Sequence, residues 1–173
     1  MESLTSPLLR GTRPAPAPAM VTAAEVDALV ASARSRGART IALGSGRDPL
    51  TRASVRLAAN AWQRSGGEVA LELTWPETAA SWLRQATRFA AADTALWIML
   101  GPPLGWAQMT RRLLWSTPWQ PARTLLTGAL SDRPALDLVG LHNLPGIAGV
   151  TAAGDTWQLT PDSRIIPVTT TRS

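Results

Sequence analysis

Residues 95–100 read Ala-Leu-Trp-Ile-Met-Leu and run directly into Gly101-Pro102-Pro103, and this stretch decides the fold. All six side chains are apolar, which is typical of a central strand in a parallel sheet that is covered on both faces. The glycine and the prolines end the strand, and Pro103 suits the first turn of a helix. We therefore predict a strand over 95–100 and a helix from Pro103 to about Trp115.

Shorter apolar runs lie on either side of this stretch and alternate with segments of helical periodicity. Strands are predicted over 40–43, 69–73, 95–100 and 124–126, with a further one near 147–150. Helices are predicted over 22–36, 48–65, 76–90 (opened by Pro76 and Glu77), 103–115 and 133–139. This alternation predicts an α/β fold with a doubly wound, mainly parallel sheet.

The predicted helix ends carry residue types that cap helices. Thr22 is a candidate N-cap, and Glu25 three residues later completes a capping box. Gly37 suits the position that follows a helix C-terminus. Asp48 and Pro49 suit the N-cap and the first position of the next helix.

The two ends of the chain differ in composition from the middle. Residues 14–18 alternate proline and alanine, which favours an extended polyproline II arm. Near the other end, two apolar runs flank Thr160-Pro161-Asp162-Ser163, whose turn chemistry predicts a β-hairpin. We divide the chain into an extended Pro/Ala-rich arm (1–20), an α/β lobe (21–150) and a C-terminal hairpin and tail (151–173).

Charge and composition limit the classes of partner. The net charge is +5, carried by 17 arginines and no lysine, and the arginines are scattered along the chain. A nucleic-acid binder concentrates its basic residues on one face and adds stacking aromatic residues. The eight tryptophans here sit mostly at apolar periodic positions, so we expect no nucleic-acid partner.

Several kinds of chemistry lack the residues that they need. The sequence has no cysteine, which excludes disulfides, thiolate metal sites and a cysteine nucleophile. His, Asp and Glu do not cluster at ligand spacing, so neither a metal nor a cofactor is predicted. No run reaches the roughly 18–20 apolar residues of a membrane span. Met1–Arg13 lacks the basic region and apolar core of a signal peptide.

A glycine-containing loop, Gly44-Ser45-Gly46-Arg47, follows the first strand and precedes a helix N-terminus, where backbone N–H groups favour anions. Pro49 stands where a dinucleotide fingerprint needs its third glycine, and a phosphate-binding Walker loop needs a lysine. We interpret the segment as an ordinary strand-to-helix loop. Arg47 either holds a carboxylate or phosphate there or is simply solvated.

No catalytic residues are predicted. Ser45, Asp137 and His142 are the residue types of a hydrolase triad, and His142 is the only histidine. The glycines lie directly beside Ser45, whereas the hydrolase elbow is Gly-x-Ser-x-Gly. We therefore expect a protein that is not an enzyme.

Candidate interface residues lie in two places. Trp115 and Trp119 flank a short Ser-Thr-Pro segment after a predicted helix, and Leu4, Leu8 and Leu9 precede the proline-rich arm. Tryptophan at such a position either covers the core or anchors an interface, where it is enriched among energetic hot spots.

At this point five segments together resemble one lobe of the type I periplasmic-binding-protein fold, a flavodoxin-like lobe. They are Gly37–Leu43, Ala61–Val69, Asp93–Ile98, Thr127–Asp132 and Leu141–Val150. The sequence is similar to ABC-transporter substrate-binding proteins of the Leu/Ile/Val type and, equally, to the lipoprotein activators of penicillin-binding proteins. The resemblance implies a periplasmic or cell-envelope location.

Members of this superfamily bind a ligand between two lobes, whereas the resemblance here covers one lobe and a hairpin. It therefore implies a non-enzymatic binding module that acts by protein–protein contact or self-association, such as a cell-envelope scaffold or activator-like subunit. The alternative is a solute-binding or sensor component of a transporter that takes an amino-acid-like small molecule.

Doubly wound sheets bind ligands at the carboxyl ends of their strands. The residues predicted there are Ser45, Arg47, Trp75, Pro102 and Thr127. An amino-acid binder should bring a serine or threonine and an acidic residue together at this edge. An assembly subunit should instead show an exposed apolar patch or a paired arm.

Overall fold

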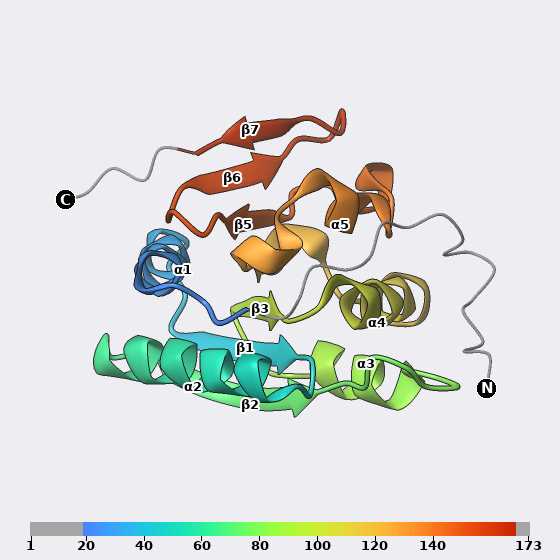
Figure 1. The fold of residues 1–173 in the computed structure, drawn as a ribbon, viewed down its shortest axis with the longest axis horizontal. Helices are drawn as coiled ribbons and strands as arrows, with labels where there is room; N and C mark the ends of the chain where they lie inside the picture. Colours follow the sequence, from blue (N-terminus) through green and yellow to red (C-terminus); the bar gives the residue numbers. More distant parts are fainter. Residues whose placement is uncertain (1–18, 169–173) are drawn as a thin grey trace.

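The structure is a computed structural model, and it describes residues 19–168. Seven strands form one sheet in the order β2-β1-β3-β4-β5-β6-β7 (Figure 1). The first five strands of the chain pair in parallel, and β6 and β7 add to β5 as antiparallel strands. The strands are β1 (Thr40–Ser45), β2 (Glu68–Thr74), β3 (Leu96–Leu100), β4 (Thr124–Leu126), β5 (Ala148–Val150), β6 (Thr156–Leu159) and β7 (Ile165–Pro167).

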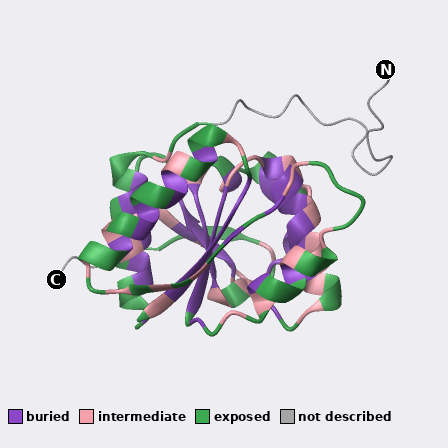
Figure 2. Cartoon of the chain, turned by 90° about the horizontal axis from the view of Figure 1, so that it is seen from below, coloured by how far each residue is buried: buried purple, intermediate pink, exposed green. Residues whose placement is uncertain are grey.

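Helices cover both faces of this sheet, as Figure 2 shows. Residues of α1 and α2 form one buried cluster with the sheet, and residues of α3, α4 and α5 form the other. The predicted doubly wound, mainly parallel sheet is therefore confirmed. The helices are α1 (Ala23–Ser35), α2 (Pro49–Arg64), α3 (Leu83–Ala90), α4 (Pro103–Ser116) and α5 (Arg133–Asp137), with 3₁₀ turns η2 (Pro121–Arg123), η3 (Gly128–Leu130) and η4 (Leu141–Asn143).

Strand β3 shows why its sequence is apolar throughout. Leu96, Ile98 and Leu100 belong to the cluster with α1 and α2, whereas Trp97 and Met99 belong to the cluster on the opposite face. Successive side chains of a strand point to opposite faces of the sheet. When helices cover both faces, every side chain of the strand is buried, and apolar residues are favoured at each position. All five residues of β3 are buried.

The helix caps form as predicted. The Thr22 hydroxyl accepts from the Glu25 N–H, and the Glu25 carboxylate accepts from the Thr22 N–H, so the capping box is complete. Gly37 follows α1 with a φ of 71°. Asp48 caps α2 by accepting from the Thr51 N–H at 2.9 Å, and Pro49 is the first residue of that helix.

Two local predictions were wrong. The helix predicted to open at Pro76 and Glu77 begins only at Leu83. Glu77 accepts from the N–H of the distant Gly105, and within the segment the Trp82 indole donates to the Pro76 carbonyl at 2.9 Å. One long-range and one local hydrogen bond thus hold this segment outside the helix.

Gly44 and Ser45 lie in strand β1 rather than in the predicted loop. Ser45 is opposite Thr74 of β2 and Leu100 of β3. Strand β1 is longer than its apolar run because strands on both sides continue to pair with it. The C-terminal hairpin forms as predicted and extends the sheet beyond β5.

Gly44 is required by close packing in the middle of the sheet. A Cβ atom at this position would lie 2.6 Å from Cζ3 of Trp75 and 2.7 Å from Cζ of Phe89. The two rings meet edge to face, with their centroids 6.4 Å apart. Neither ring can move away easily, because both side chains are fully buried.

We predict that Gly44→Ala lowers the free energy of unfolding by about 1–3 kcal/mol, the usual cost of overpacking a core. Ser45→Ala is the matched control on the same strand, because its hydroxyl only donates to the adjacent Gly46 carbonyl. Urea unfolding of both variants measures the difference. Equal midpoints for the two variants would contradict the packing argument.

Candidate functional site

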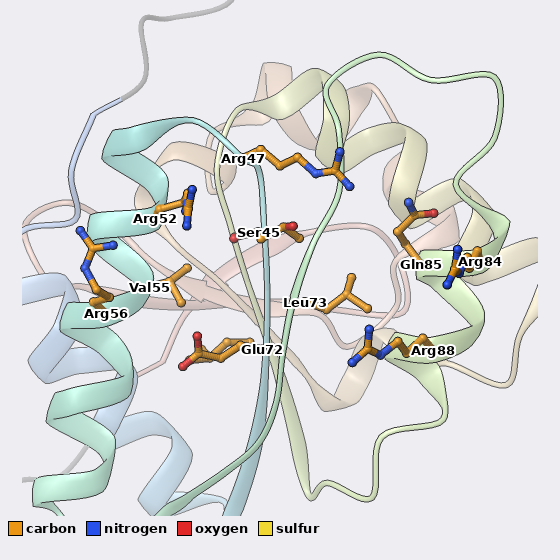
Figure 3. A pocket seen from close by; sticks show the side chains of 12 residues that line it. Ser45, Arg47, Arg52, Val55, Arg56, Glu72, Leu73, Arg84, Gln85 and Arg88 are labelled. Atoms are coloured by element: carbon orange, nitrogen blue, oxygen red, sulfur yellow. The ribbon is translucent and has the colours of Figure 1, made fainter.

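Two cavities lie beside the first turns of α2. The first, here called the carboxyl-end crevice, has a volume of about 370 Å³ and lies where β3 and β4 end. The second, here called the arginine groove, has a volume of about 580 Å³ and lies between α2 and α3 around strand β2 (Figure 3).

Helix α2 separates the two cavities. Thr51 and Ser54, three residues apart, line the carboxyl-end crevice. Arg52, Val55 and Arg56 line the arginine groove. Residues three positions apart lie on the same side of a helix, so Thr51 and Ser54 share one face. The adjoining face of the same two turns lines the arginine groove.

The carboxylate of Glu25 fixes one wall of the carboxyl-end crevice. It is buried, and its Oε2 accepts from the Thr22 N–H at 2.8 Å. Its Oε1 accepts from the Gly128 N–H, directly after β4, at 2.7 Å. A Cβ atom at Gly128 would lie 2.8 Å from this Oε1, so the approach needs glycine. The start of α1 is therefore tied to the end of β4.

Hydroxyl groups and a carboxylate surround the crevice. Thr51, Thr127 and Asp132 line it, and within residues 19–168 neither threonine hydroxyl has a hydrogen-bond partner. Asp132 uses Oδ1 to cap α5, accepting from the Ala135 N–H at 2.8 Å. Its Oδ2 makes no such bond to the described residues. Threonine and acidic residues thus meet at one sheet edge, which is the arrangement expected of an amino-acid binder.

The structure divides the five predicted ligand residues. Pro102 and Thr127 line the carboxyl-end crevice, whereas Ser45 and Arg47 line the arginine groove. Trp75 is fully buried and lines neither cavity. Its N–H continues the ladder by donating to the Ser45 carbonyl at 2.9 Å, and its ring packs against Phe89 in the core.

The sequence analysis missed the other crevice residues, namely Glu25, Thr51, Ser54 and Asp132. Glu25 and Asp132 were assigned only local roles, as a capping-box residue and as a residue that caps and solvates a short helix. Both caps exist, but Glu25 has a second, long-range partner that sequence spacing does not reveal.

The predicted interface residues differ in exposure. Trp115 is 77% exposed at the end of α4. Trp119 is 5% exposed and belongs to the core, so its predicted place on an exposed surface is wrong. The 3₁₀ turn η2, which begins at Pro121, follows Trp119 and leads the chain into the buried strand β4. Leu4, Leu8 and Leu9 lie outside the described residues.

Reactive groups are sparse around both cavities. The Ser45 hydroxyl donates to the neighbouring Gly46 carbonyl, and no histidine is among the described residues that line either cavity. Over residues 19–168, no three His, Asp or Glu side chains gather closely enough to hold a metal ion. In the same range, no helix combines the length and apolar character of a membrane span.

Glu77 lies close to this edge, and its surroundings shift its pKa. Burial raises the pKa of Glu77, and the negative charge of Asp48 raises it further, while the hydrogen bond from the Gly105 N–H opposes the shift. Oε1 of Glu77 and Oδ2 of Asp48 are buried without a partner among the described residues. This corner of the sheet edge therefore disfavours the charged form of Glu77.

A sheet in the order β2-β1-β3-β4-β5, flanked by two helices on one face and three on the other, is the architecture of one lobe of a type I periplasmic binding protein. Comparison with solved structures agrees with this assignment. A substrate-binding periplasmic protein from Ralstonia solanacearum superposes with a TM-score of 0.62 over 75% of this chain, at 14% identity.

Two further solved structures have the same lobe. A periplasmic ligand-binding protein of a branched-chain amino acid ABC transporter from Burkholderia xenovorans matches with a TM-score of 0.60, at 12% identity, over 74% of this chain and 34% of its own. A solute-binding protein of an ABC transporter from Rhodopseudomonas palustris, in complex with p-hydroxybenzoic acid, matches with a TM-score of 0.60, at 15% identity, over 72% of this chain and 34% of its own.

At these identities the similarity establishes the fold. The match covers 36% of the Ralstonia protein, so this chain corresponds to about a third of the length of its structural neighbours. No family model matches the sequence, and no curated protein matches it in sequence.

We predict that Glu25→Ala lowers the free energy of unfolding by about 3 kcal/mol, since it leaves two backbone N–H groups without a charged acceptor. Glu25→Gln should lose less, because one carbonyl acceptor remains. Asp27→Ala, an exposed position on the same helix, should change stability by less than about 0.5 kcal/mol. Denaturant unfolding tests the series, and a Glu25→Ala loss as small as that of Asp27→Ala would contradict the proposed role of Glu25.

We also predict a pH-dependent effect of Glu77→Gln. Because the pKa of folded Glu77 is raised, its favourable contribution is complete below the ordinary glutamate pKa, about 4.3, and is lost as the pH rises through the folded pKa. The melting temperature of Glu77→Gln, relative to that of the wild type, should therefore rise between pH 4 and pH 7. Glu72→Gln, exposed on β2, controls for the change in net charge. A difference in melting temperature between wild type and Glu77→Gln that stays constant from pH 4 to pH 7 would contradict the prediction.

Proposed function

We propose that this lobe binds an amino-acid-like small molecule in the carboxyl-end crevice and forms one wall of the binding cleft. The observation that carries the proposal is the set of Thr51, Thr127 and Asp132 around one cavity. Asp132 offers a free carboxylate oxygen to an ammonium group, and the threonine hydroxyls can donate to a carboxylate. The cavity lies at the carboxyl ends of β3 and β4, where doubly wound sheets bind their ligands.

The structural neighbours support a small-molecule ligand over a scaffold role. One is described as the periplasmic ligand-binding protein of a branched-chain amino acid ABC transporter, and another was solved with p-hydroxybenzoic acid. The neighbours are binding proteins rather than enzymes, and on the same similarity we propose a periplasmic location for this chain. No catalytic role is proposed for any residue.

The size of the crevice suggests that a second wall completes it. A volume of about 370 Å³ lies at the lower end of the roughly 300–1,000 Å³ range of small-molecule pockets. Since the chain corresponds to about a third of its structural neighbours, we propose that another polypeptide segment supplies the opposite wall. Binding by the lobe alone is then weak.

One observation favours protein contact as a second function. Trp115 exposes 77% of its surface at the end of α4, and tryptophan is enriched among the energetic hot spots of interfaces. Trp115 is therefore the residue at which we propose that a protein partner docks.

The test of ligand binding is thermal unfolding of the full chain with millimolar amino acids, with p-hydroxybenzoate as a ligand that lacks an amine. A ligand at ten times its dissociation constant adds about 1.4 kcal/mol of stability, which raises the melting temperature by a few degrees. We expect the shift from amino acids and not from p-hydroxybenzoate.

The matched variants are Asp132→Asn and Asp137→Asn. Asparagine caps a helix as well as aspartate does, so Asp132→Asn keeps the α5 cap while it removes the charge and should abolish the shift. Asp137→Asn changes the same charge on the same helix, outside the crevice, and should keep it. No shift with any amino acid, or an equal shift in both variants, would rule out this site.

A further inference from the structure

We propose that the arginine groove binds an extended acidic peptide segment, which pairs with the free edge of β2 as an added strand. This site is separate from the carboxyl-end crevice, because helix α2 stands between the two cavities. The groove is the larger of the two, at about 580 Å³, and the function proposed above does not use it.

Strand β2 offers backbone hydrogen-bonding groups to such a segment. It is the first strand in the sheet order, and β1 is its one neighbour within the described residues. The Trp75 N–H, just after β2, points inward to the Ser45 carbonyl. Because backbone groups alternate in direction along a strand, the N–H groups of Glu72 and Thr74 point outward. An extended peptide can therefore add to this edge.

The charge around this edge is strongly positive. Five arginines line the groove and one glutamate, Glu72, opposes them; the arginines are Arg47, Arg52, Arg56, Arg84 and Arg88. None of the five guanidinium groups forms an ion pair or a hydrogen bond with another described residue. Arginine binds carboxylates through a planar fork of donors, so the groove suits a partner rich in aspartate or glutamate.

The arginines form two rows on opposite sides of the strand (Figure 3). Arg52 and Arg56 project from α2, and Arg84 and Arg88 project from α3. Positions four apart on a helix are separated by about 6 Å along its axis. Side chains two apart on a strand are separated by about 6.7 Å. An added strand with acidic residues on both faces would thus match both rows in spacing.

Two other occupants fit the groove less well. A second copy of this chain, pairing β2 with β2, would bring its own five arginines to the same edge, and like charges placed together oppose association. A single-stranded nucleic acid would need stacking surfaces, and no aromatic side chain is among the residues that line the groove.

The test uses the full chain and a fluorescein-labelled peptide of consecutive glutamates, which places an acid at every second position on both faces of a strand. Fluorescence anisotropy should show saturable binding at 50 mM NaCl that weakens at 500 mM, because salt screens exposed charges. The same peptide N-methylated at every residue has no backbone N–H to donate along either edge and should bind at least tenfold more weakly. A lysine-for-glutamate peptide should not bind.

Charge-reversal variants locate the site. Arg56→Glu with Arg88→Glu, one change in each row, should weaken binding by about tenfold or more, the sum of several exposed charge contacts. Arg133→Glu with Arg164→Glu changes the net charge equally at exposed positions outside the groove and should leave binding unchanged. Circular dichroism checks that both proteins are folded.

Three outcomes would overturn the proposal. One is the absence of binding at low salt. Another is equal loss in both double variants, which would indicate attraction to the overall positive charge. The third is equal binding of the N-methylated peptide or of a single-stranded oligonucleotide, which would indicate a polyanion surface without strand pairing.

Discussion

The carboxylate of Glu25 is the constraint on which the carboxyl edge of the sheet depends. It accepts two backbone N–H groups, from Thr22 at the start of α1 and from Gly128 after β4. The Thr22 hydroxyl in turn donates to the Ala152 carbonyl at 2.7 Å. The start of α1 and the end of β4 therefore meet at one buried carboxylate, and the Ala152 segment joins them through the Thr22 hydroxyl. Hydrogen bonds to a charged acceptor are stronger than those between neutral groups. The crevice walls are fixed relative to one another by this single side chain.

Helix α2 distributes polar side chains to two different surfaces. Thr51 and Ser54 face the crevice, whereas Arg52 and Arg56 face the groove around β2. A compact polar solute suits the first surface, because the polar groups there converge on one small cavity. An elongated anionic partner suits the second, because its arginines lie in rows rather than around one point. One lobe can in this way present a small-molecule site and a peptide site without overlap between them.

The sequence predicted the features that depend on neighbouring residues. The apolar run of β3, the capping box of Thr22 and the Asp48-Pro49 helix start all follow from local spacing, and all are present. The start of α3 was misplaced because Glu77 is held by Gly105, a residue far away in the sequence. The candidate site was only partly predicted for the same reason. Strand ends indicated Pro102 and Thr127, whereas the packing of Gly44 against Trp75 and Phe89, which buries Trp75, is visible only in three dimensions.

The mixed sheet also has a consequence for the order in which the chain assembles. Strands β5, β6 and β7 are joined by short turns, so their pairing closes only small loops. Strand β1 must find β3 across a whole intervening helix–strand–helix segment, and closing such a loop costs more entropy before any contact is gained. The antiparallel end of the sheet can therefore form early. The parallel part, which carries both candidate binding surfaces, depends on slower long-range closure, and its outermost strand β2 leaves an edge to which other chains can add while folding is incomplete.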